Sequence, residues 1–486
     1  MTREEWDELK RGISLMKMRS VRNQYDPLGW YFQSNIHGWP KYDASAGAQS
    51  MVNKHNWHRC QHGHYFFLPW HRMYLYFFER ILQRVTGNPN MTVPYWDYFD
   101  PEQRALPETF RIPPDTQHNP LYVRERCRAI NSGMPLREEN VSPVPALSAS
   151  FFATDDRIDQ FHVCHAFGGG QSQPKIIAPK QGLLERIPHD NIHMFIGGPN
   201  GFMSDECRAS RDPIFWLHHS QIDRLWESWK AMGGSGPVAV DNSDQFYNQT
   251  FDFYDDSGRR KTYRVSDFMD TAKSLNYRYD RLYVAENQVK VRRNVTKIPD
   301  VFVTARQRNE AKLAIVPVEQ MSIPLELEPR GRKLFEKLAK SADQLPKLRF
   351  SLQLNFNYID STHIYNMHMN LPNSTYPYEN PPYFLGSLVY FQANCVPLIR
   401  RELRQIKKCF DITDNVKLIL KQNYQFSGTV IQDINITFVP KTCDDIVLFH
   451  HKRGTGSSSG SGSSGSSSLD TMIRFNEIHL IHYFSK

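Results

Sequence analysis

The chain contains no run of about 18 apolar residues, the shortest length that crosses a membrane as a helix. Its first residues, MTREEWDELKRG, also lack the apolar segment of a secretory signal. We therefore expect a soluble chain without a transmembrane segment; if it is secreted or organellar, the targeting segment is absent from this sequence. Asn-x-Ser/Thr sequons would suit a secretory route but also arise by chance in long chains, so the compartment stays open; they occur at Asn90, Asn140, Asn248, Asn294, Asn373 and Asn435.

Clustered positive charge is also missing. The formal net charge of +8 is spread along the chain, and the densest basic stretch, 400–408, is interrupted by Glu402, Leu403 and Ile406. A nucleic-acid-binding protein would show a basic stripe with interleaved aromatic residues or a known reader motif. We interpret this stretch as a solvated face and expect no nucleic-acid partner.

Cysteine is scarce, with 7 among 486 residues. A chain of this length can bury its core, in two or three domains, without a disulfide or metal scaffold. Aromatic residues make up 13% of the chain, which suits a large packed core. Composition by itself does not identify an enzyme.

The first part of the chain has the periodicity of helices. Apolar residues recur at helical spacing in 6–18, 69–82 and 213–229. Long connections with Pro and Gly lie between these stretches, as expected of a helical scaffold that carries functional loops. We expect a mainly helical domain over 1–283.

The second part has the periodicity of strands. Apolar residues alternate with polar ones in 348–356 and again in 434–438, which predicts an antiparallel β domain over 321–486, after a linker at 284–320. Within it, 454–468 is almost pure Gly and Ser and is expected to be a flexible tether, of natural or engineered origin.

Several histidines fall into two blocks with similar surroundings. The first block holds Ile36-His37-Gly38, Cys60-Gln61-His62 and Phe67-Leu68-Pro69-Trp70-His71. The second holds Pro188-His189-Asp190-Asn191-Ile192-His193 and Phe215-Trp216-Leu217-His218-His219, and Asp223-Arg224-Leu225-Trp226 closes it.

These blocks have the spacing of metal ligands. His189 and His193 are four residues apart, so on a helix that begins at Pro188 both rings lie on one face and can meet a single ion. A third histidine from a crossing helix completes three ligands, and two such half-sites make a six-histidine dinuclear pocket. Imidazole ligands alone suit copper, zinc or nickel, and three per ion leave positions open for chemistry. An isolated pair at this spacing binds no metal in about half of its occurrences or more, so the argument depends on the two similar frames.

The two blocks resemble the copper A and copper B signatures of the tyrosinase, catechol oxidase and molluscan haemocyanin superfamily. Tyr277-Arg278-Tyr279 resembles the tyrosine motif that closes the catalytic domain of plant polyphenol oxidases. The resemblance implies a four-helix bundle around a site with two copper ions, followed by an antiparallel β-sandwich or barrel-like domain. It also implies dioxygen and a small phenol as the molecules that the site handles.

The family's ligands map onto six histidines of this chain. Two positions keep alternatives: His55 or His58 could replace His37, and His218 could replace His219. The Ile-His-Gly context favours His37, and aligning 67–71 with 215–219 favours His219 and makes His218 a supporting residue. The preferred copper A ligands are His37, His62 and His71, and the preferred copper B ligands are His189, His193 and His219. His64, His162 and His165 are interpreted as pocket-wall or core residues.

Cys60-Gln61-His62 matches the fungal and molluscan pattern in which the cysteine sulfur is joined to the second copper A histidine by a thioether. A simple buried cysteine is the alternative. If Cys60 is used in this way, each domain keeps an odd number of cysteines, and complete pairing would need a disulfide between the domains. The remaining cysteines are Cys127, Cys164 and Cys207 before the boundary, and Cys395, Cys409 and Cys443 after it.

The activity that the resemblance implies is the oxidation of phenols or o-diphenols to o-quinones with dioxygen. Glu185 matches the family's glutamate that holds a water as proton acceptor; its alternative role is a favourable charge at a helix amino terminus. Asp190 stands where many tyrosinases have Asn, and it could strengthen the base or repel acidic substrates. Met194 is expected to form an apolar pocket wall, and Asp223 and Arg224 to support the ligand rings from behind.

The β domain resembles the shielding domain of plant polyphenol oxidases at 383–387 and 436–440. This suggests a latent enzyme that is activated by cleavage near 284–320. A reversible oxygen carrier like haemocyanin is the alternative function, and Glu185 and Tyr277-Arg278-Tyr279 favour the enzyme. A dizinc hydrolase is disfavoured because no carboxylate bridges the histidines. The sequence does not separate monophenol from diphenol oxidation or give the oligomeric state.

Overall fold

The computed structural model describes residues 1–41, 45–154, 165–174, 180–234, 243–283, 301–307, 313–315, 320–341, 345–356, 364–370, 383–389, 391, 406–441 and 473–484. The Gly/Ser tether at 454–468, His162, Cys164, Cys395 and Cys443 lie outside the described residues. Among the helices of the described part, none combines the length and apolarity needed to cross a bilayer.

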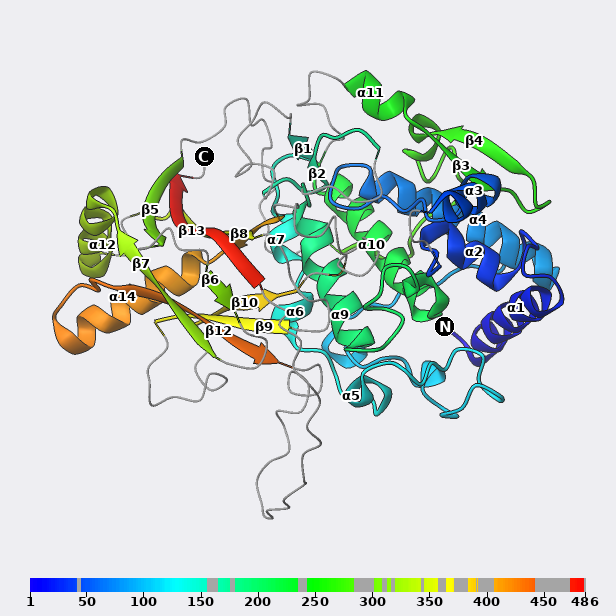
Figure 1. Ribbon diagram of the computed structural model, residues 1–486, viewed down its shortest axis with the longest axis horizontal. Helices are drawn as coiled ribbons and strands as arrows, with labels where there is room; N and C mark the ends of the chain where they lie inside the picture. The colour runs from blue at the N-terminus through cyan, green and yellow to red at the C-terminus, as the bar shows by residue number, and fades with distance from the viewer. Residues whose placement is uncertain are drawn as a thin grey trace, which may run out of the picture.

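The amino-terminal domain is mainly helical (Figure 1). Its helices are α1 (Arg3–Arg22), α2 (Trp30–His37), α3 (Ala46–His55), α4 (Phe67–Thr86), η1 (Pro101–Gln103), η2 (Glu108–Phe110), α5 (Arg128–Asn131), α6 (Glu138–Val141), α7 (Val144–Leu147), η3 (Glu185–Asp190), α9 (Asn191–Gly197), η4 (Ala209–Arg211), α10 (Ile214–Ala231), α11 (Ser243–Asn248) and η5 (Val265–Phe268). Two small sheets accompany them, the parallel pair β1 (Ala153–Thr154) and β2 (Gly169–Gly170) and the antiparallel pair β3 (Thr250–Tyr254) and β4 (Arg260–Arg264).

Local sequence explains where the two longest helices of the site begin and end. Helix α4 ends at Gly87, which adopts a left-handed φ of 73° that glycine tolerates best. Helix α10 follows Pro213, a residue favoured at helix starts. The two helices pack against each other, and the ring of Phe78 stacks on Trp216 with centroids 3.4 Å apart. This contact fixes α4 against α10 and therefore places the histidines that both helices carry.

In its described residues, the carboxy-terminal domain is an antiparallel sheet with two helices. Its strands are β5 (Val301–Gln307), β6 (Leu313–Ile315), β7 (Met321–Leu327), β8 (Leu348–Phe356), β9 (Ile364–Met369), β10 (Phe384–Leu388), β11 (Ile406–Asp411), β12 (Ile434–Lys441) and β13 (Ile473–Phe484). They follow the order β10-β9-β12-β7-β5-β13-β8-β11, and β6 pairs with β13. Helices α12 (Pro329–Ser341) and α14 (Thr413–Ser427) lie at the end of this domain that is farther from the helical domain (Figure 1).

Two of these strands correct the expected domain boundary. Strand β5 pairs with β7 and β13, and β6 pairs with β13, although both lie within 284–320, the expected linker. The sheet therefore begins at Val301. Both strands are short, so their apolar and polar residues show little alternation, and their partner β13 lies far along the chain. The sequence pattern therefore did not predict them.

The two domains share a packed interface. Val389 and Phe391 of the second domain belong to the same apolar cluster as Met194 and Phe195 of the first. Ser387 Oγ also donates a hydrogen bond to Asn140 Oδ1, at 3.4 Å. The carboxy-terminal domain, called the covering domain below, thus lies directly against the segment that carries the second histidine block.

Candidate metal centre

Five helical elements and the segment before α4 bring the six preferred histidines together. His37 is the last residue of α2, His71 lies in the first turns of α4, and His219 lies in α10. His189 is in η3 and His193 in α9, and the segment before α4 contributes His62. All six side chains are at most 2% exposed.

The first histidine block forms one compact group of rings. The ring centroids of His37 and His62 are 5.4 Å apart, those of His37 and His71 5.5 Å, and those of His62 and His71 5.0 Å. Three imidazoles from separate chain segments therefore converge on one point, as a three-ligand metal site requires.

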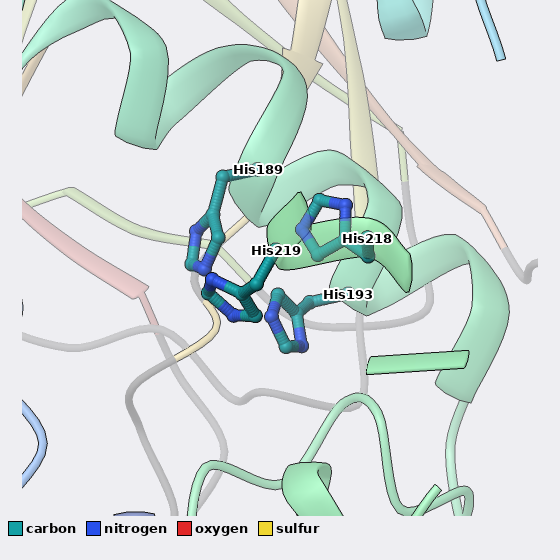
Figure 2. Close-up of side chains that lie close together, drawn as sticks. All are labelled: His189, His193, His218 and His219. Atoms are coloured by element: carbon teal, nitrogen blue, oxygen red, sulfur yellow. The ribbon is translucent and has the colours of Figure 1, made fainter. Parts of the chain in front are cut away.

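The second block forms a matching group, drawn in Figure 2. The ring centroids of His189 and His193 are 4.5 Å apart, so the four-residue spacing does place both rings together. His219 completes the group, at 5.1 Å from His189 and 5.7 Å from His193. Ile187 is non-helical, and the helical backbone runs on from Pro188 through Asp190 and Asn191 into α9, so both rings lie on one continuous helix as expected.

The two groups lie side by side. The rings of His71 and His219 stack with centroids 4.3 Å apart and planes 3° from parallel, and those of His62 and His189 are 5.6 Å apart. Two ions held by these groups would be close neighbours, as the expectation of one dinuclear pocket requires.

The hydrogen bonds of the rings fit metal ligation. In all six rings Nε2 is buried without a hydrogen-bond partner, a costly state unless a cation is bound there. Nδ1 of His37, His71 and His193 donates to the backbone oxygens of Glu206, Phe67 and Met203, at 3.0, 2.8 and 2.7 Å. Because a carbonyl can only accept, these rings keep their proton on Nδ1 and leave the Nε2 lone pair available.

Burial keeps most of these rings neutral. Desolvation is the largest cause that lowers the pKa of five of them, His37, His71, His189, His193 and His219, well below the usual value. Burial alone would also lower the pKa of His62, but the Glu206 carboxylate outweighs it and raises that pKa. Neutral imidazoles are the form that binds metal ions.

The structure also places the alternative histidines. The ring of His55 stacks on Trp57 and Tyr25, 4.7 and 5.0 Å away, and His58 Nδ1 accepts a hydrogen bond from the Trp39 amide. His37, by contrast, lies against the rings of His62 and His71, so the geometry favours His37 as the ligand.

His218 remains close to the second group. Its ring centroid is 5.1 Å from that of His193, and its Nε2 is also buried without a partner, but its Nδ1 lies 3.2 Å from the Tyr98 hydroxyl, whereas neither nitrogen of His219 has a partner. This difference favours His219 as the ligand and His218 as a neighbour tied to Tyr98. Of the core candidates, His64 is buried against Phe66, and His165 contacts Tyr483.

Two carboxylates flank the second block. Glu185 Oε1 accepts a hydrogen bond from the Gly63 amide at 2.7 Å, and burial raises the pKa of this side chain to about 8. Asp190 is fully buried; its Oδ1 lies 3.1 Å from His189 Nδ1, and its Oδ2 accepts from Lys408 Nζ, also at 3.1 Å. Lys408 belongs to β11, so a carboxylate that orients a candidate ligand is paired with a cation of the covering domain.

The expected supporting residues act through the helices. Asp223 contacts none of the six rings; its Oδ1 accepts from Arg72 Nε at 2.6 Å, and its Oδ2 accepts from the hydroxyls of Tyr277 and Tyr279, each at 2.7 Å. It therefore ties α4, α10 and the tyrosine motif together behind His71 and His219. Arg224 donates to Asp97 in the same way, at 2.8 Å.

Sequence reasoning missed three residues of the site. Glu206 is fully buried, and its Oε1 accepts from Cys60 Sγ at 2.9 Å and from His62 Nδ1 at 3.0 Å. Phe391 stacks on the ring of His193 with centroids 3.8 Å apart, and Lys408 pairs with Asp190. All three are distant in sequence from the site residues that they touch, and no motif marks them. Met194, the expected pocket wall, is buried in the same apolar cluster as Phe391.

Cys60 differs from the other described cysteines. Cys60 is a buried free thiol, the only one among the described residues, and Cys127, Cys207 and Cys409 are disulfide-bonded. A ligand atom of His37, of Cys60 and of His62 all lie within 4.8 Å of one another. Cys60 is therefore close to His62, although the structure shows no covalent bond between them.

Comparison with known proteins agrees with the histidine pattern. The model of the common central domain of tyrosinase matches residues 27–160 and 138–232. A tyrosinase of Hahella sp. (strain CCB-MM4) is 32% identical over 326 residues, 61% of this chain and 65% of that protein. A chloroplastic polyphenol oxidase of Vitis vinifera is 29% identical over 293 residues, 57% of this chain and 46% of that protein. The matched part thus spans about half to two thirds of these relatives.

The fold has close counterparts among solved structures. Latent apple tyrosinase superimposes with a TM-score of 0.59 at 18% identity, covering 99% of this chain and 95% of that one. A latent aurone synthase, described as a polyphenol oxidase, gives 0.58 at 18% identity, covering 100% and 88%. At this identity the likeness supports the fold: a helical domain followed by an antiparallel β domain.

Proposed function

Because this chain belongs to the tyrosinase and polyphenol oxidase family of type 3 copper proteins, we propose that it oxidises phenols or o-diphenols to o-quinones with dioxygen. The observation that carries the proposal is the set of six buried Nε2 atoms without partners, in two adjacent groups of three. The relatives described above are oxidases, which disfavours the oxygen-carrier alternative.

Two copper ions would be held by the two groups, one by His37, His62 and His71 and the other by His189, His193 and His219. When bound, copper supplies the electron transfer between phenolic substrate and dioxygen. The protein's own part is to fix the rings: backbone carbonyls hold the Nδ1 protons of three of them, and Asp190 holds His189. Such partners set the tautomer and the aim of Nε2.

Glu185 is proposed as the proton acceptor for a phenol substrate. Its carboxylate is anchored by the Gly63 amide, directly after the ligand His62, and burial raises its pKa toward neutrality, where a general base works best. Nearby metal cations would draw that pKa down again when the site is loaded, keeping the carboxylate ionised. Asp190 carries a negative charge beside it, and in the covered state Lys408 offsets that charge.

The covering domain is proposed to keep the enzyme latent. The ring of Phe391 stacks on His193 at an interplanar angle of 28° and contacts the rings of His62 and His189 edge-on, both at 5.8 Å. A planar phenol would compete for the same face of His193. Removal of the domain by cleavage near 284–300, before β5, would therefore expose the site.

A substitution pair tests the copper site directly. In full-length protein, His37→Ala should lose one of two bound copper ions and the catechol oxidase activity measured after protease treatment, whereas His55→Ala should retain both. Copper content is measured by atomic absorption, and quinone formation by absorbance. Equal effects of the two substitutions, or zinc in place of copper in active protein, would contradict the proposal.

A further inference from the structure

A single residue, Glu206, contacts three side chains of the first metal group. Glu206 lies in the loop between α9 and η4, and its side chain is fully buried. Its backbone oxygen accepts from His37 Nδ1, and its Oε1 accepts from His62 Nδ1. The same Oε1 accepts from the Cys60 thiol, at 2.9 Å. One residue thus contacts two candidate ligands and the free cysteine.

The loop can approach this closely because Gly38 has no side chain. A Cβ atom on Gly38 would lie 2.5 Å from the Glu206 backbone oxygen and 2.5 Å from the Cys207 Cα, closer than real Cβ contacts. Gly38 has an extended backbone that any residue can adopt, so the glycine is required by this contact and not by its conformation. The position of Glu206 is therefore built into the packing.

We propose that Glu206 is a positioning residue, whose Oε1 holds the Cys60 thiol beside the His62 ring so that a thioether forms between them. The inference rests on the proposed copper site, because the reaction needs copper and dioxygen. The shared oxygen holds the sulfur within 4.8 Å of a ring nitrogen of His62. The bond to Nδ1 also keeps the His62 Nε2 lone pair toward the metal, so the ring is held in the orientation in which it is modified.

The step balances with dioxygen as the oxidant. The S–H bond of Cys60 and one ring C–H bond of His62 break, and one C–S bond forms. The two electrons and two protons released reduce dioxygen to hydrogen peroxide. The product is lighter than the unmodified chain by two hydrogen atoms, which a peptide mass records.

A different role for the same sulfur predicts a different product. Cys60, His37 and His62 offer ligand atoms within one small sphere, so the sulfur could instead bind copper as a thiolate. That arrangement would leave the thiol free after denaturation, whereas the thioether would not react with alkylating reagents. The two roles are therefore separable by chemistry on the unfolded chain.

The experiment uses metal-free full-length protein loaded with copper in air. The mass and alkylation of the peptide that contains Cys60 and His62 are followed with time, together with copper content and melting temperature. Glu206→Gln keeps the shape and removes the charge, and Glu79→Gln is the matched control, because Glu79 is a mostly buried carboxylate on α4 that accepts from the Val93 amide. Gly38→Ala displaces the Glu206 loop and serves as a second variant should Glu206→Gln fail to fold.

Wild type and Glu79→Gln are expected to form the thioether at the same rate. Glu206→Gln should form it about tenfold more slowly at unchanged copper content, because a charge-assisted hydrogen bond becomes a neutral one. Gly38→Ala should slow it as well. Wild-type rates in both variants would overturn the inference, as would copper-loaded wild type whose Cys60 stays alkylatable; both results leave the proposed function standing. Wild type that binds no copper would overturn the proposed function and this inference with it.

Discussion

The buried pair between Lys408 and Asp190 should control how tightly the covering domain is held. Lys408 Nζ lies 3.1 Å from Asp190 Oδ2, with side chains 3% and 0% exposed, and it also donates to the Val389 backbone oxygen at 2.5 Å. Beside it, Arg186 Nη1 of the helical domain donates to the Cys409 backbone oxygen. Lys408 of the covering domain thus bonds to the helical domain, and Arg186 of the helical domain bonds to the covering domain.

Lys408→Met removes one of these cations and leaves the carboxylate of Asp190 buried. Breaking a buried ion pair from one side costs about 3–5 kcal/mol. A docking equilibrium shifts tenfold for about every 1.4 kcal/mol, so the ratio of uncovered to covered protein should rise by about 100-fold to about 4,000-fold if the whole cost falls on docking. Activity toward catechol without protease should increase accordingly, as a fraction of the activity after full proteolysis.

The matched control and the double variant separate charge from general damage. Lys407→Met changes the neighbouring, partly exposed residue of β11 and should leave latency unchanged. Asp190→Asn alone removes the carboxylate partner of Lys408 and should also weaken covering, whereas the double variant Asp190→Asn with Lys408→Met should recover most of the latency, since neither member of the pair is then charged. Dividing by the activity after proteolysis removes any direct effect of Asp190 on catalysis.

Two results would refute this reasoning. In one, Lys408→Met shows the same low activity before proteolysis as Lys407→Met. In the other, Lys408→Met lowers the melting temperature but does not raise that activity, so that the pair stabilises the fold without holding the domain over the site.

The remaining predictions concern single side chains. Phe391→Ala removes the ring that stacks on His193 and about 3–5 kcal/mol of packing. The uncleaved protein should then be more active and bind small aromatic inhibitors more tightly. Unchanged inhibition constants would contradict this. Because the pKa of Glu185 is raised from 4.5 to about 8 in the fold, the unfolded chain loses this proton first, and metal-free protein loses stability as the pH rises between these values. Glu185→Gln should remove this loss of a few kcal/mol in unfolding free energy, which is fully present above pH 8. Denaturant unfolding at several pH values measures it, and parallel pH profiles of the two proteins would count against it. Asp223→Asn should lower the unfolding free energy by about 1–3 kcal/mol because it removes the carboxylate that Arg72, Tyr277 and Tyr279 share, although Glu227 still pairs with Arg72. The exposed substitution Asp7→Asn should cost almost nothing. Equal losses in denaturant melts would show that the Asp223 network is not needed.

The histidine blocks were predictable because their spacing has a local cause. Four residues between His189 and His193 place two rings on one face of a helix, and the similar frames ending at His71 and His219 place two more on crossing helices. The structure brings these rings together, and comparison with relatives supports the family that the frames suggested.

The residues that sequence reasoning missed act through tertiary contacts. Glu206 reaches Cys60 across 146 positions of the chain, and Lys408 reaches Asp190 across 218. A lone glutamate in a turn and one lysine in a basic stretch have no periodicity that marks them, and in the sequence 400–408 looked like a solvated face. Strand β5 was taken for linker for the same reason, since its pairing with β13 joins distant segments.

Anomalous diffraction from crystals of copper-loaded protein, measured at the copper absorption edge, tests the central claim most directly. The account predicts two strong peaks, one beside Nε2 of His37, His62 and His71 and the other beside Nε2 of His189, His193 and His219. A single peak, or copper bound away from these two groups of rings, would contradict it.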